Sequence, residues 1–152
     1  MAPWPWTRNL QDRRSGAIAL GTIGGEKACD ALIPLLKSSS AEERDSAVAA
    51  LGGAKCVRGY EPSVKALADE NYAVSASTAM ALDDIGDKRA VEPLLTMLNK
   101  DDTDTVKIGT VVSLGALGDK RVIPPLEKML KSEKSENVRQ QIEVSLRQLR
   151  QQ

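Results

Sequence analysis

The stretch Ala79-Met-Ala-Leu-Asp-Asp-Ile-Gly-Asp-Lys-Arg-Ala-Val-Glu-Pro-Leu-Leu95 decides the fold, because the chain contains near copies of it. The segment Val111-Val-Ser-Leu-Gly-Ala-Leu-Gly-Asp-Lys-Arg-Val-Ile-Pro-Pro-Leu126 repeats its leucine, its Gly-Asp-Lys-Arg turn and its proline 32 residues further on. We take this leucine as the anchor of each copy. The anchors are spaced by 31, 31, 32 and 32 residues and are Leu20, Leu51, Leu82, Leu114 and Leu146. A near-constant period of this length predicts a repeat architecture in which each unit packs on its neighbours.

The pattern within each unit predicts two helices. The first, over residues 89–98 in one copy, carries Leu94 and Leu98 on one stripe at helical spacing. The second, over residues 103–117, has apolar residues at i, i+5, i+8 and i+11, which again fall on one face. A glycine suited to a left-handed cap follows the second helix in three copies: Gly24, Gly86 and Gly118. Because no alternating strand pattern occurs, we expect an all-α chain.

The repeats predict one solenoid over residues 10–152, after an irregular segment at residues 1–9. Prolines at positions 3 and 5 exclude a regular helix in that segment. The space before Leu20 holds only one helix, so we expect a lone helix over about residues 10–23 and then four helix pairs. Either Trp4 or Trp6 covers the exposed first helix, or the chain is truncated there. At the other end, residues 137–152 have the polar surface of a capping helix.

The two quoted stretches are similar to the HEAT-like repeat of the phycobilisome-lyase type, a shortened HEAT motif of about thirty residues. The resemblance covers nearly all of the chain after Leu10 and implies a right-handed α–α superhelix. It also implies bonds between neighbouring repeats, for which Asp87 with Lys107 and Asp119 with Arg139 are the expected pairs. The turn at residues 54–56 departs from the Gly-Asp pattern of the family, so we expect it to be irregular.

Composition and charge exclude several functions. The 152 residues include 21 basic and 21 acidic side chains, so no net positive charge attracts nucleic acid or an anionic membrane. Histidine is absent, which removes the side chain that most often transfers protons or binds transition metals. No apolar run approaches the roughly 20 residues of a membrane span and no signal peptide opens the chain. We therefore expect a cytoplasmic protein.

No cofactor, metal ion or catalytic residue is predicted. The glycines at 52 and 53 lack the spacing of a phosphate loop. Three acids near the end of one second helix are better explained as solvated residues than as a metal site: Asp83, Asp84 and Asp87. Two cysteines without a secretion signal predict reduced thiols, with Cys29 a small core residue and Cys56 exposed in the irregular turn. A reactive thiol at Cys56 is the alternative.

The second helices carry the candidate binding surface, because in solenoids of this kind they line the concave side. The residue two before the anchor is apolar in every copy: Ile18, Ala49, Met80, Val112 and Val144. Neighbouring positions extend this stripe into a predicted partner-binding patch: Ile18, Tyr72, Ala76, Met80, Ile108, Val112 and Ala116. A mixed polar rim is expected around it: Arg14, Asp45, Asp84, Asp104 and Gln148. The alternative is that tight curvature buries the stripe as ordinary core.

Two functions remain. The first is a non-catalytic, monomeric scaffold that holds a protein or peptide segment on its concave face. The second follows from the resemblance, since subunits of bilin lyases, which attach or detach an open-chain tetrapyrrole at a cysteine of a phycobiliprotein, are similar to this chain. In that case the propionate groups would be bound by a basic residue of the second helices: Arg13, Arg14, Arg44 or Lys107. A nucleic-acid-binding solenoid is disfavoured by the lack of a basic face.

Overall fold

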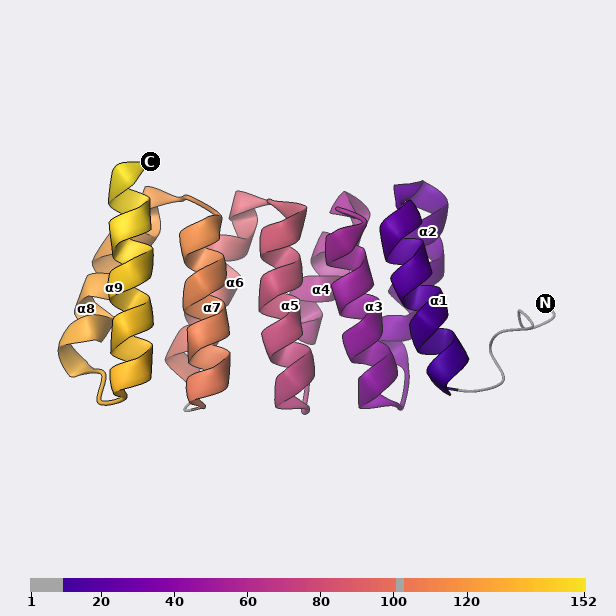
Figure 1. Cartoon of the computed structure of the whole chain (residues 1–152), viewed down its shortest axis with the longest axis horizontal. Coiled ribbons are helices and arrows are strands. Elements are labelled where there is room, and N and C mark those ends of the chain that lie inside the picture. The colour runs from indigo at the N-terminus through magenta and orange to yellow at the C-terminus, as the bar shows by residue number, and fades with distance from the viewer. Residues whose placement is uncertain (1–9, 101–102) are drawn as a thin grey trace.

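The computed structural model describes residues 10–100 and 103–152, and these form two layers of helices (Figure 1). The odd-numbered helices stand side by side in the front layer of the view, and the even-numbered helices lie behind them. The front layer consists of α1 (Leu10–Ile23), α3 (Ala41–Gly53), α5 (Tyr72–Ile85), α7 (Asp104–Ala116) and α9 (Glu136–Gln151). The back layer consists of α2 (Gly25–Leu32), α4 (Tyr60–Ala66), α6 (Val91–Lys100) and α8 (Ile123–Ser132).

Short 3-10 segments accompany every helix of the back layer. One, η2 (Ile33–Lys37), continues α2, whereas the others lead into α4, α6 and α8: η3 (Val57–Gly59), η4 (Lys88–Ala90) and η5 (Lys120–Val122). The structure thus confirms the lone first helix, the four helix pairs and the all-α solenoid, and the described residues include no strand. The predicted segment 1–9, with Trp4 and Trp6, lies outside the described residues.

Polar residues at the helix boundaries begin and end the helices as the sequence predicts. Ser40, Asn71 and Ser135 each accept a hydrogen bond from a backbone N–H in the first turn of the helix that follows. Three glycines have a positive φ after the helices of the front layer: Gly24 (67°), Gly86 (76°) and Gly118 (65°). A side chain is disfavoured in this conformation, so these glycines stop the helices and turn the chain into the back layer.

The turn after α3 is irregular, as expected, because its left-handed position is occupied by a lysine. Lys55 has φ 49°, and the N–H groups of Lys55 and Cys56 donate to the carbonyls of Gly52 and Leu51. These bonds satisfy the last carbonyls of α3 in the way that a glycine cap does elsewhere.

The core lies between the two layers and is almost entirely aliphatic. Leu51, Leu82 and Leu114 have no exposed surface and Leu146 is 3% exposed, while Leu20 is half-buried. One cluster runs continuously from Tyr60 to Leu149. Four of the five anchors are therefore core residues, and their units bury the apolar side of each helix against the neighbouring unit.

Glycines directly after the anchors bring neighbouring front-layer helices close together. A Cβ on Gly21 or Gly52 would lie 2.9 or 2.8 Å from the backbone Cα of Ala50 or Ala81, respectively, and one on Gly115 would lie 2.9 Å from Ser145 Oγ. Only a residue without a side chain allows this approach. The equivalent position in the third copy is Asp83.

The prediction of two reduced thiols is wrong, because Cys29 of α2 and Cys56 form a disulfide with Cα atoms 5.9 Å apart. Cys56 is also buried rather than exposed. The left-handed turn at Lys55 brings Cys56 back against the end of α3, where it meets Cys29. The cytoplasmic location stays a prediction, and disulfides are more typical of oxidising compartments.

The predicted pairs between repeats, Asp87 with Lys107 and Asp119 with Arg139, are also wrong. Asp87 and Asp119 accept hydrogen bonds from Arg89 and Arg121, two residues further along their own turns. Those turns follow the C-terminal ends of α5 and α7, whereas Lys107 and Arg139 lie near the N-terminal ends of α7 and α9. A helix of this length separates its two ends by about 20 Å, so the expected partners cannot meet.

Basic residues near the start of the front-layer helices instead bind the segments that connect the two layers. Arg44 donates to the Ser38 carbonyl and to both oxygens of Asp69, and Arg139 donates to the Leu130 carbonyl. In the third copy, Ser75 donates to the Asp69 carbonyl from the same position. These side chains satisfy carbonyls at the ends of the back-layer segments, which have no partner within their own helix.

Candidate functional site: the odd-helix face

The candidate site is the outward surface of α1, α3, α5, α7 and α9, which we call the odd-helix face (Figure 1). Each helix contributes one exposed apolar residue to an apolar row that crosses this face: Ile18, Ala49, Met80, Val112 and Val144. Met80 is 56% exposed and Val112 is 40% exposed. The alternative in which this row is ordinary core is therefore wrong.

Four other predicted patch residues divide into two groups. Tyr72 is 60% exposed at the start of α5 and Ala116 is exposed at the end of α7, so both add apolar surface to the helices that carry Met80 and Val112. Ala76 and Ile108 are half-buried and pack against the central core. Both lie four residues before the apolar row, where the neighbouring helices partly cover them.

On the three central odd-numbered helices, α3, α5 and α7, acidic side chains reach the surface, whereas the basic ones are held in ion pairs. Glu42 and Asp84 are exposed, and Asp45 and Asp83 are half-buried. The only two basic residues in these helices, Arg44 and Lys107, are bound elsewhere. Their nitrogens lie 2.7 Å from Asp69 Oδ2 and 3.1 Å from Glu133 Oε2, respectively.

The hydrogen bond from Arg44 holds the pKa of Asp69 below its usual range. The bilin-binding alternative requires a basic side chain that can bind a propionate group. Arg44 and Lys107 are not available for this, because both are held in ion pairs. The side chains of Arg13 and Arg14 lie outside the part of the chain described in atomic detail. The rim residues whose side chains are described are Asp45, Asp84, Asp104 and Gln148, and three of them are acidic.

Two aspartates at the end of α5 are close to one another. Partial burial, together with the charge of Asp84, raises the pKa of Asp83 to about 6. Asp84 Oδ2 lies 3.2 Å from the point where a Cβ of Gly52 would stand, so this carboxylate lies over the neighbouring helix α3. In α3 itself, Asp45 Oδ1 is buried without a hydrogen-bond partner.

The described acids of this face do not form a metal-binding cluster. Among the described residues, no group of three or more acids or cysteines is arranged to hold a metal ion. Asp87 is directed to Arg89 rather than to Asp83 and Asp84.

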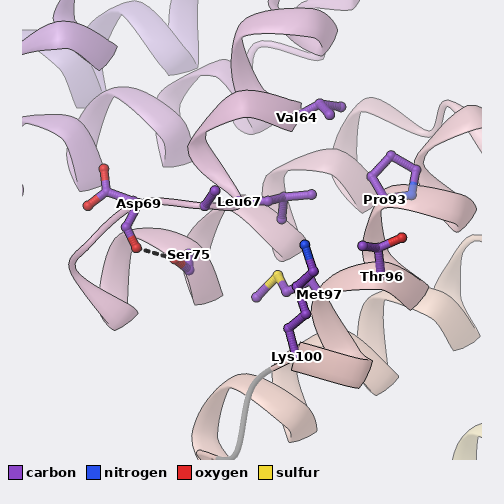
Figure 2. Close-up of a pocket in the computed structure, with 9 residues that line it drawn as sticks. Val64, Leu67, Asp69, Ser75, Pro93, Thr96, Met97 and Lys100 are labelled. Carbon is purple, nitrogen blue, oxygen red and sulfur yellow. Dashed lines mark hydrogen bonds between the residues drawn. The ribbon is translucent and has the colours of Figure 1, made fainter.

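Pockets that the sequence did not reveal lie on the other side of the molecule. One, with a volume of about 380 Å³, opens between α4 and α6 and is lined by Val64, Leu67, Pro93 and Met97 (Figure 2). Asp69 and Ser75 also line this pocket, and Ser75 Oγ donates to the Asp69 carbonyl at 3.1 Å (Figure 2). No motif predicts this pocket, because it depends on how far apart two back-layer helices lie.

Comparison with known proteins agrees with this architecture. The profile described as HEAT repeats matches residues 60–147, which is more than half of the chain. The profile described as PBS lyase HEAT-like repeat matches residues 12–38. The chain therefore belongs to the HEAT repeat family. A search of curated protein sequences found no match.

HEAT repeats generally mediate protein–protein interaction, and proteins of this class are typically scaffolds rather than enzymes. None of the helices in the described ranges is both long enough and apolar enough to cross a membrane.

Proposed function

We propose that this protein is a non-catalytic binding module whose odd-helix face holds a segment of a partner protein. The observation that carries the proposal is the apolar row, which places one exposed apolar side chain on each of five neighbouring helices. Contiguous apolar surface costs free energy in water and usually marks a binding site. Met and Tyr, here Met80 and Tyr72, are also enriched where proteins bind one another.

The packing of the two layers supports a concave shape for this face. In the front layer the glycines after the anchors leave no room for a side chain between neighbouring helices. In the back layer, pockets of about 380 and 500 Å³ open between α4 and α6 and between α6 and α8. A stack that is tighter in one layer bends toward that layer, and such curvature creates the binding surfaces of solenoids.

The test is a double substitution on the apolar row. Met80→Asp with Val112→Asp adds two charges at exposed positions, so we expect partner capture from a native lysate to fall at least tenfold with little change in the thermal melt. The matched control is Ala31→Asp with Val57→Asp, which adds two charges at exposed apolar positions of α2 and η3. Equal capture by both variants would contradict the proposal.

A further inference from the structure

We infer that the segment held by the odd-helix face is a basic amphipathic helix whose apolar stripe lies along the apolar row. The inference rests on the proposed function and adds the chemistry of the partner. It is argued from the placement of charges around the row and from the spacing of the row itself.

The first step is the sign of the charge. Helices α3, α5 and α7 contain six acids and two basic residues. Both basic residues are bound to acids outside these helices, Arg44 to Asp69 and Lys107 to Glu133. Glu43 is buried against Ser38. The other five acids remain at least partly exposed: Glu42, Asp45, Asp83, Asp84 and Asp104.

The second step is where these acids lie. Successive residues of a helix are rotated by about 100°, so positions seven before, four before, and four after a residue share its face. Glu42 and Asp45 stand seven and four residues before Ala49 of the row, and Asp84 stands four residues after Met80. Acids therefore flank the row on both of its sides.

This separation of charge is a property of the face and not of the whole chain, whose net charge is zero. The other basic residues between positions 10 and 152 lie in the turns, in the back layer and in the end helices α1 and α9, so the acidic part of the odd-helix face is its centre. A surface of one sign attracts a segment of the opposite sign and disfavours acidic competitors.

The third step is the spacing. Packed helices lie about 8–10 Å apart, so the side chains of the row recur at roughly that distance. Seven residues of an α-helix span about 10.5 Å, slightly more than this spacing, so apolar residues at heptad spacing meet the row when the helix crosses it obliquely. An extended segment shows the same face about every 7 Å, which is shorter than this spacing and cannot be lengthened, because the chain is already fully extended. A helix of about 14 residues reaches from Ala49 to Val112.

The test uses the full chain and three synthetic helical peptides of about 20 residues, measured by fluorescence anisotropy. The first has leucines at heptad spacing flanked by lysines, the second has glutamates in place of the lysines, and the third is a scrambled form of the first. We expect the lysine peptide to bind at least tenfold tighter than either other peptide, and less tightly as salt is raised.

The matching variants change charge without changing size. Asp45→Asn with Asp84→Asn should weaken binding of the lysine peptide about five- to tenfold, because two rim charges are lost. The control Glu26→Gln with Glu92→Gln removes two exposed acids from α2 and α6 and should leave binding within about twofold. Circular dichroism verifies that all variants remain folded.

Each other outcome overturns the inference. Equal binding of the lysine and glutamate peptides, or equal effects of the two charge variants, rules out the basic partner. Equal binding of the scrambled peptide rules out the helical stripe. Suppose that the glutamate peptide binds the wild-type protein and that Met80→Asp with Val112→Asp abolishes this binding. The partner is then not basic, which overturns the inference, but the apolar row still binds a segment and the proposed function stands. If Met80→Asp with Val112→Asp captures partners from the lysate as well as the wild type does, both the inference and the proposed function fail.

Discussion

At the residue scale, Asp83 shows how one substitution within a repeat changes a helix contact. Three other copies have glycine at this position, where the front-layer helices approach closely. The carboxyl group of Asp83 is instead half-buried beside Asp84, and both effects raise its pKa to about 6. A charged group in this place opposes folding at neutral pH.

This raised pKa predicts a pH-dependent gain from Asp83→Asn. The pKa of Asp83 is higher in the folded state than in the unfolded state, so folding favours its neutral carboxyl group. Its contribution to the free energy of unfolding is therefore fully present below about pH 4 and is lost as the pH rises through 6. The amide imitates the neutral carboxyl group, so we expect the variant to exceed the wild type in stability at pH 7.5. Because Asp83 is partly exposed, the gain should stay below about 1 kcal/mol.

Urea unfolding of both proteins between pH 4 and pH 8 measures this difference in stability. We expect the two curves to converge toward pH 4. A difference that does not change with pH would show that the carboxyl charge of Asp83 is not its cause.

At the element scale, the glycines after the anchors determine how closely α1, α3, α5, α7 and α9 can pack. Gly52 faces the backbone of α5 across a gap too narrow for a methyl group. Gly109, in the interior of α7, faces open space. The same glycine-to-alanine change therefore has opposite consequences at the two sites.

We expect Gly52→Ala to destabilise the protein by about 1–3 kcal/mol, because α3 and α5 must move apart. Gly109→Ala should stabilise it by up to about 1 kcal/mol, since alanine favours a helix interior over glycine. Urea midpoints of the two variants give the comparison directly. A loss of stability in both, or in neither, would mean that the close approach of α3 and α5 is not limiting.

At the scale of the whole molecule, each unit of the solenoid packs mainly on its neighbours, so a local change spreads little along the stack. The Cys29–Cys56 disulfide joins the first two units over a sequence separation of 27 residues. Closing a loop of that length restricts the unfolded chain and stabilises the folded state by about 3 kcal/mol.

Reduction should therefore lower the melting temperature by roughly 6–12 °C. Reduction should increase the rate of backbone amide hydrogen exchange mainly in α1, α2 and α3, and should change it little in α7, α8 and α9. The double variant Cys29→Ala with Cys56→Ala is the control, because its melting should no longer respond to reductant. Two thiols reacting with a thiol reagent in the unreduced, denatured protein would contradict the bond itself.

Much of the fold and part of the site could be predicted from the sequence. The period between anchors predicted the helix pairs, and the lone helix from Leu10 to Ile23 was placed correctly. The exposure of Met80 and Val112 also followed from helix geometry, since a residue two before a buried anchor points away from the core. These properties depend on neighbours within a few turns of one helix, and that information is written locally in the chain.

Tertiary structure decided which groups from different units meet. Cys29 reaches Cys56 only because Lys55 adopts a left-handed turn, and Arg44 binds Asp69 because the start of α3 lies beside the end of the next back-layer segment. The acidic surroundings of the apolar row arise in the same way, since the two basic residues of the central helices turn toward the loops. Such pairings depend on distances between separate elements, which a repeat period does not specify.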